Sequence, residues 1–175
     1  MRGWRRLILL FFSMVLSACA PSALNRSSDD GFDGKPWEIQ RAELPRYPRN
    51  ENLIQIYVSP TTTFRFFVDP GSVSVSEDGP IRYTLVARSP SGATNVSYEG
   101  IRCETRERKL YAFGTDDGTW IQARSSRWVS ISEDAANRQQ AALADDFFCP
   151  ERGRVRTTEE AVSVLKQGAY SGVAR

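Results

Sequence analysis

The chain has 175 residues, of which 41% are hydrophobic and 25% charged, and it contains three cysteines and no histidine. This length fits one domain. The absence of histidine excludes the Ser-His-Asp and Cys-His arrangements of hydrolases, and it removes the commonest side-chain ligand of metals. We therefore expect no histidine-based enzyme, no bound metal and no other cofactor.

The first eighteen residues have the pattern of a lipoprotein signal peptide. Three arginines precede an apolar run at residues 7–16, namely Arg2, Arg5 and Arg6. The run is shorter than the roughly 20 apolar residues that a membrane-spanning helix needs. Ser17 and Ala18 then lead directly to Cys19, and this ending resembles the lipobox of bacterial lipoproteins, in which the cysteine accepts diacylglycerol. The alternative is an ordinary secretory signal followed by a chance cysteine.

Lipidation of Cys19 would anchor the protein, because two or more acyl chains hold a protein stably at a bilayer. Ala20 follows this cysteine where Asp would favour the inner membrane, so we expect a lipid-anchored protein on the periplasmic face of the outer membrane. Its partners would be the lipid bilayer and an envelope protein or peptidoglycan. Removing three arginines from 23 basic residues leaves 20, against 21 acidic ones, and this balance gives no reason to expect a nucleic-acid partner.

Composition divides the rest of the chain into a tether and a domain. Residues 19–36 are rich in Ser, Asp, Gly and Pro and carry few large apolar side chains, which predicts a flexible, lipidated tether. Residues 37–175 predict a single α+β domain. Between residues 53 and 131 β-branched and aromatic residues alternate with polar ones, which predicts an antiparallel meander of about six to eight strands. Its clearest feature is a hairpin at 81–103, and we expect a β-bulge there, at Gly100.

Two C-terminal helices should follow the strands. Ser132 can cap the first helix, which Pro150 would end. Thr157 and Glu160 have the spacing of a capping box, which predicts the start of a short second helix. Strands followed by helices are typical of the α+β class.

Cys103 and Cys149 are the thiols that remain once Cys19 carries lipid. Because the periplasm is oxidising, such a leftover pair is expected to form a disulfide. A metal site and two buried free thiols are the alternatives, and the metal site lacks further soft ligands.

Four blocks of residues carry a resemblance to a known family. The longest is 82–103, and the others are Phe66-Phe67-Val68-Asp69, residues 117–128 with their Asp-Gly-Thr-Trp start, and residues 137–150 with their Asp-Phe-Phe-Cys-Pro end. Together they resemble the cryptic neisserial protein-like family of proteobacterial lipoproteins over about residues 37–150. The resemblance implies an envelope lipoprotein and brings no catalytic residues with it.

Arginine and tryptophan residues form the candidate ligand surface, which consists of Arg102, Arg124, Arg127, Trp120 and Trp128. If neighbouring strands stack these side chains, their guanidinium and indole groups can bind carboxylates or sugar faces. The alternative is a solvated sheet face whose charges serve solubility.

We therefore expect a non-catalytic interaction or structural module facing the periplasm. The second hypothesis is a binder of a small anionic or peptidoglycan-derived ligand, which a pocket containing Arg102, Arg124 and Trp128 would favour. The third hypothesis is an enzyme that uses carboxylates alone. It ranks last because the acidic residues fall mostly in expected turns and exposed faces, where Asp and Glu ordinarily titrate near pH 4, far from neutral pH.

Overall fold

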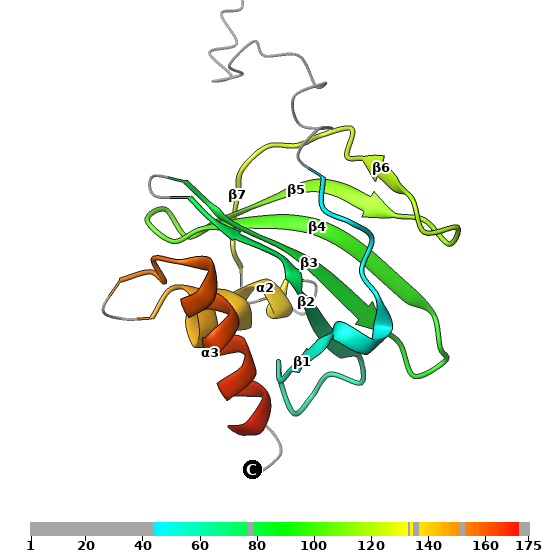
Figure 1. Ribbon diagram of the computed structural model, residues 1–175, viewed down its shortest axis with the longest axis horizontal. Coiled ribbons are helices and arrows are strands. Elements are labelled where there is room, and N and C mark those ends of the chain that lie inside the picture. The colour runs from blue at the N-terminus through cyan, green and yellow to red at the C-terminus, as the bar shows by residue number, and fades with distance from the viewer. Residues whose placement is uncertain (1–43, 77–78, 133, 135–136, 151–152, 172–175) are drawn as a thin grey trace, which may run out of the picture. The chain divides into compact units, whose positions relative to one another are not determined.

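The computed structural model describes residues 44–76, 79–132, 134, 137–150 and 153–171. They form an antiparallel sheet of seven strands in the order β1-β2-β3-β4-β5-β6, with β7 paired to β5. The two C-terminal helices lie on one side of this sheet (Figure 1), so the predicted α+β class is confirmed. The strands are β1 (Ile54–Ile56), β2 (Arg65–Val75), β3 (Ile81–Arg88), β4 (Thr94–Arg102), β5 (Glu107–Gly114), β6 (Trp120–Gln122) and β7 (Val129–Ser130).

Several sequence expectations lie outside the described residues. They are the signal peptide at 1–18, the lipidation site Cys19 and the tether at 19–36. Within the part of the chain that the structure describes, no helix has both the length and the apolar composition to cross a bilayer.

The predicted hairpin consists of β3 and β4, which pair without interruption from Ile81↔Ile101 to Arg88↔Thr94. Gly92 has a φ of 93° in the turn between them, a conformation that glycine adopts at little cost. No bulge is found at Gly100, which pairs regularly with Arg82 of β3. The pairing of β4 with β5 shifts register next to it, between Tyr98 and Glu99.

The middle of β2 is irregular around Asp69. The register with β3 shifts between Asp69 and Ser74. The Asp69 carboxylate accepts a hydrogen bond from the backbone N–H of Gly71 (3.0 Å), and the Ser72 hydroxyl accepts one from the N–H of Thr84 (2.7 Å). These side chains therefore satisfy backbone N–H groups where the regular β2–β3 pairing is interrupted, because a buried backbone group without a partner is costly.

The first C-terminal helix begins later than predicted. It comprises α2 (Arg138–Ala142) and the π-helix η2 (Leu143–Phe148), and Asn137 precedes it. Ser132 does not cap it, since its hydroxyl donates to Asp134 (2.7 Å) and accepts from the Asn137 amide (3.0 Å). The Ser132 side chain thus stabilises a turn before the helix.

The second helix, α3 (Thr158–Ser171), starts at the predicted capping box. The backbone N–H of Glu160 donates to the Thr157 hydroxyl (3.1 Å). In return, the Glu160 carboxylate accepts a hydrogen bond from the N–H of Arg156 (2.7 Å), one residue before the expected partner.

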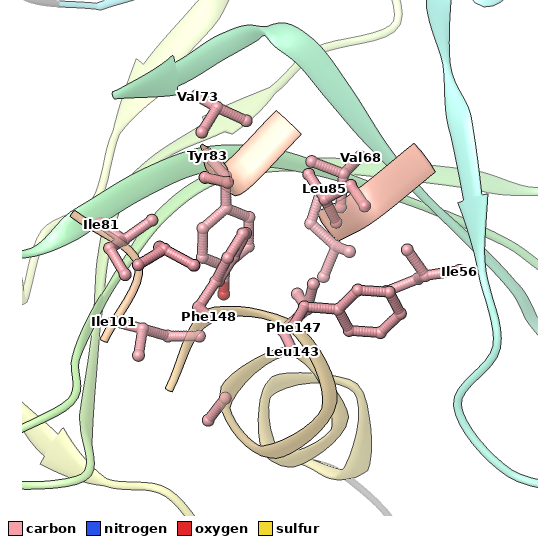
Figure 2. Close-up of a cluster of buried hydrophobic side chains, with 14 of the residues drawn as sticks. Ile56, Val68, Val73, Ile81, Tyr83, Leu85, Ile101, Leu143, Phe147 and Phe148 are labelled. Carbon is pink, nitrogen blue, oxygen red and sulfur yellow. The ribbon is translucent and has the colours of Figure 1, made fainter. Parts of the chain in front are cut away.

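The main core lies between the helices and the sheet face that they cover, which we call the inner face. Alternate residues of β3 and β4 point into it, and Figure 2 shows Tyr83, Leu85 and Ile101 opposite Leu143 and Phe148 of η2. The predicted disulfide is present between Cys103, after β4, and Cys149, after η2. It links the sheet covalently to the helical layer.

The opposite face, which we call the outer face, is covered by the segment before β1. Residues 44–53, here named the N-terminal strap, run across the strands and include the short 3-10 helix η1 (Asn50–Asn52) (Figure 1). Tyr47 and Leu53 pack on a small cluster around Phe67. The Trp120 indole N–H donates to the carbonyl of Pro45 (2.9 Å). The strap thereby closes an apolar part of the outer face.

Candidate functional site

Beyond the strap, the outer face carries cationic side chains from three adjacent strands. Arg82 of β3 pairs with Gly100 of β4, and Gly100 pairs with Lys109 of β5. Arg102 follows two residues after Gly100 and lies on the same face, because side chains alternate along a strand. The register therefore brings two guanidinium groups and an ammonium group together.

Gly100 leaves space for aromatic rings between these cations. A β-carbon at this position would lie 2.9 Å from Tyr111 Cε2 and 3.5 Å from a ring carbon of Trp128. The first distance is shorter than a van der Waals contact, so a larger residue here would displace the Tyr111 ring. This close approach, and not a bulge, is the structural reason for the glycine.

Trp128 enters the site from the segment before β7. The pairing of Val129 with Arg108 fixes this segment along β5, and the Ser126 hydroxyl donates to the carbonyl of Leu110 (2.8 Å). The guanidinium carbon of Arg102 lies 4.2 Å from the centre of the Trp128 ring. At this distance the cation and the indole face attract each other.

The other two cations lie near Tyr111. The guanidinium carbon of Arg82 is 5.5 Å from the centre of its ring, and Lys109 Nζ is 5.3 Å from the same point. A pocket of about 220 Å³, which we call the outer pocket, opens between these groups. It is lined by Pro80, Arg82, Tyr98, Arg102, Lys109, Tyr111 and Trp128.

The pKa of Lys109 reflects both its partial burial and the positive charges of the outer pocket. Partial burial lowers the pKa of Lys109, and the guanidinium groups of Arg102 and Arg82 lower it further. Arg102 also contacts an acid, since its Nη1 lies 3.4 Å from Glu107 Oε2. An anion that entered the pocket would relieve the repulsion among the cations, so the site is suited to carboxylate or phosphate groups.

The structure brings together two of the five predicted surface residues, Arg102 and Trp128. Trp120 is a neighbour of the pocket, with its ring 6.2 Å from that of Tyr98, but it packs under the strap. Arg124 and Arg127 are exposed in the connection between β6 and β7 and do not line the pocket. Because this connection is not a strand, no register directs their side chains toward Arg102.

Sequence reasoning missed the remaining residues that line the pocket. The sequence around Arg82 and Lys109 could have indicated their position. Each lies in a strand whose side chains alternate between the two faces, so the face of each could be assigned from its neighbours. The sequence predicted the hairpin at 81–103 but not its register, which places Arg82 opposite Gly100. The contribution of Tyr111 could not be seen, because the register shift beside Tyr98 decides where its ring lies.

Buried carboxylates bear on the enzyme hypothesis, which assumed mostly exposed acids. Among the described residues, Asp69 and Glu99 are the buried acids. The Glu99 carboxylate accepts hydrogen bonds from Ser97 (2.6 Å), Tyr83 (3.2 Å) and Gln140 (3.0 Å). Burial, followed by the nearby Glu99 charge, raises the pKa of Tyr83 well above its ordinary value. The register places Asp69 on the outer face and Glu99 on the inner face, so these two acids do not form a catalytic pair.

Comparison with known proteins identifies the family. Residues 32–166 of the sequence match the model of the CNP1-like family. The chain belongs to this family. It is also similar to Cryptic neisserial protein 1 of Neisseria gonorrhoeae (strain ATCC 700825 / FA 1090), with 26% identity over 191 residues and 94% of each chain covered. No solved structure matches the chain. The family match confirms the resemblance found in the sequence, and it spans every residue that lines the outer pocket.

Proposed function

We propose that this member of the CNP1-like family is a non-catalytic, lipid-anchored envelope protein that binds an anionic group in its outer pocket. The observation that carries the proposal is the convergence of Arg82, Arg102 and Lys109 over the rings of Tyr111 and Trp128. The three cations repel each other, and this repulsion adds to the burial that lowers the pKa of Lys109. Binding of an anion turns that repulsion into attraction.

The size of the pocket indicates which part of a ligand enters it. Sites for complete drug-sized ligands typically enclose roughly 300–1,000 Å³, whereas the outer pocket has about 220 Å³. We therefore infer that it takes one carboxylate or phosphate group together with a few neighbouring atoms. The free carboxylate of a peptidoglycan stem peptide has this chemistry.

A titration with a soluble muropeptide tests this assignment. Arg102→Ala removes the guanidinium that lies on Trp128, and we expect at least about tenfold weaker binding, since a charge-assisted hydrogen bond contributes roughly 1.5–3 kcal/mol. Arg124→Ala is the matched control, because Arg124 is exposed and lies outside the pocket. Inorganic phosphate and acetate, titrated in parallel, show which anion the pocket prefers. Equal binding by the Arg102 and Arg124 variants would overturn the proposal.

A docking module for an envelope protein is the second candidate. One observation favours it: Phe113 of β5 and Ile121 of β6 pair in register and are 50% and 59% exposed. Two large apolar side chains side by side on a surface are common at protein interfaces. In crosslinked envelopes, Ile121→Ser should then reduce recovery of one defined partner while Arg102→Ala leaves it unchanged. The reverse result would favour the anion-binding role.

The lipid anchor is tested separately. Cys19→Ala should abolish labelling by a palmitate analogue and release the protein from membranes, because no acyl chain can then be attached. Unchanged labelling of the variant would refute lipidation at this residue. Membrane association that persists without label would show that a partner, and not lipid, holds the protein.

A further inference from the structure

A second cavity lies on the inner face, on the side of the sheet opposite the outer pocket. The helices cover only part of the inner face, and a groove of about 440 Å³ remains between β3–β5 and the loop before β2. We call it the inner groove. Six of the residues that line it carry the argument, namely Phe64, Phe66, Glu99, Arg108, Leu110 and Phe113.

One wall of the inner groove is apolar and open to solvent. Phe64 and Phe113 are 40% and 50% exposed. The Phe64 ring stacks on that of Phe66, with 6.3 Å between their centres, and Leu110 of β5 completes the wall. Covering apolar surface of this kind with another apolar group is favourable, because it removes that surface from water.

The other end of the groove is polar, and its two charged groups differ in how well they are satisfied. The Glu99 carboxylate is buried and already accepts three hydrogen bonds, from Ser97, Tyr83 and Gln140. Arg108 donates from Nη2 to Asn137 Oδ1 (2.7 Å), whereas its Nε is buried and has no acceptor. Among the described residues, no carboxylate lies within ion-pair distance of Arg108.

A buried donor without an acceptor is unfavourable, so binding of a ligand whose acceptor reaches the Arg108 guanidinium from the groove is favoured. The nearby Glu99 charge limits the ligand to a single negative charge, because a second one would face a carboxylate in a low-dielectric site. The apolar wall requires an apolar body. The groove volume falls within the range of small-molecule sites, roughly 300–1,000 Å³.

We propose that the inner groove binds an amphipathic monoanion, a medium-length fatty acid or a molecule of the same chemistry. Its hydrocarbon chain lies against Phe64, Leu110 and Phe113, and its carboxylate accepts hydrogen bonds from Arg108. This site is independent of the outer pocket, since the two lie on opposite faces of the sheet and share no lining residue.

The test uses the full-length protein in lipid nanodiscs and a photoreactive dodecanoate with a diazirine near the chain end. We expect competable labelling of peptides around residues 62–66 and 108–114. Arg108→Gln should lower labelling at least about tenfold, which corresponds to 1.4 kcal/mol, and Arg124→Gln is the matched control. Phe113→Ser should lower it as well, and because Phe113 is half exposed this variant keeps the test valid if Arg108→Gln does not fold.

The possible outcomes separate the parts of the proposal. Labelling by a photoreactive dodecan-1-ol that equals labelling by dodecanoate would overturn the carboxylate contact with Arg108. Labelling that Phe113→Ser leaves within about twofold of the wild-type value would overturn the groove itself. Absence of competable labelling in the wild-type protein would overturn the whole proposal. None of these results depends on whether the outer pocket binds an anion.

Discussion

The two faces of the sheet are covered by different elements. On the inner face, α2, η2 and α3 bury the residues that alternate inward from β3 and β4, and a disulfide links sheet to helices. On the outer face, a strap of ten residues covers one apolar area and leaves the cationic outer pocket beside it. The comparison teaches that the helix-covered part of the inner face serves stability, whereas the outer pocket beside the strap is open to a ligand. Substitutions in the helix-covered core should therefore affect folding first, and those in the outer pocket should affect binding first.

The largest expected effect is on the inner face, where Cys103 and Cys149 link the two layers. Replacing both by Ala should lower the free energy of unfolding by roughly 4 kcal/mol, because the chain-entropy model gives this value for a loop closed at a sequence separation of 46. Urea unfolding of the oxidised wild-type protein and the double variant measures the difference. A loss below about 1 kcal/mol would contradict the role of the disulfide in joining the layers.

Leu143→Ala should have the next largest effect. Leu143 is fully buried in η2 against the sheet, and removing a core leucine side chain costs about 2–5 kcal/mol. Ile121→Ala is the contrasting change, since Ile121 is largely exposed and surface substitutions usually stay within about 0.5 kcal/mol. Equal losses in the two variants, measured by chemical denaturation, would remove the distinction between a core position and an exposed one.

Gly100→Ala sharpens the comparison from the outer face. The added methyl group meets the Tyr111 ring, and overpacking of this kind costs roughly 1–3 kcal/mol. We expect the Tyr111 ring to shift and binding of the muropeptide to weaken more than tenfold. The free energy of unfolding and the affinity for the muropeptide should be measured on the same sample. A variant that loses stability yet binds as tightly as the wild type would show that Tyr111 does not shape the outer pocket.

The smallest effect concerns the pH dependence of stability through Lys109. Its pKa in the folded protein is lowered from 10.5 by burial and by Arg102 and Arg82, so between the two pKa values the unfolded chain binds more protons. The free energy of unfolding should therefore rise through that window as the pH increases toward 10.5. At pH values below the pKa of Lys109 in the folded protein, this residue is charged in both states, and the unfavourable surroundings of that charge lower the free energy of unfolding in full. The rise should be missing from Lys109→Met, and the difference between the wild-type and variant unfolding curves isolates the contribution of Lys109.

The sequence was sufficient to predict the sheet, the β3–β4 hairpin and the α3 capping box, because each depends on short-range alternation or on residues three apart. It was misleading at Gly100 and Ser132. A side chain at position 100 would collide with Tyr111 of the neighbouring strand, which is why this residue is glycine. The Ser132 hydroxyl forms hydrogen bonds with Asp134 and Asn137 before the helix begins, so it does not cap the helix. Local patterns cannot distinguish these roles, since each depends on which partner the fold supplies.

The candidate site was predicted only in part for a related reason. Arg102 and Trp128 were found by residue type, and they do meet. Arg124 has the same chemistry but lies in a connection whose path no alternation specifies. Arg82 and Lys109 required the register of three strands at once, and the shift beside Tyr98 changes that register between β4 and β5.

The N-terminal strap also determines how the domain responds to a mechanical load. Within the described residues, a pull on the chain from its N-terminal side reaches Leu44 and Pro45 before it reaches β1. The first contacts to bear force are then those of the strap, the Trp120 indole bond to the Pro45 carbonyl and the Tyr47 hydroxyl bond to the Thr115 carbonyl. We expect these two bonds to break before the ladders that join β2 to β3, β3 to β4 and β4 to β5. On this expectation the strap detaches first, and the part of the outer face beneath it is exposed before the sheet unfolds.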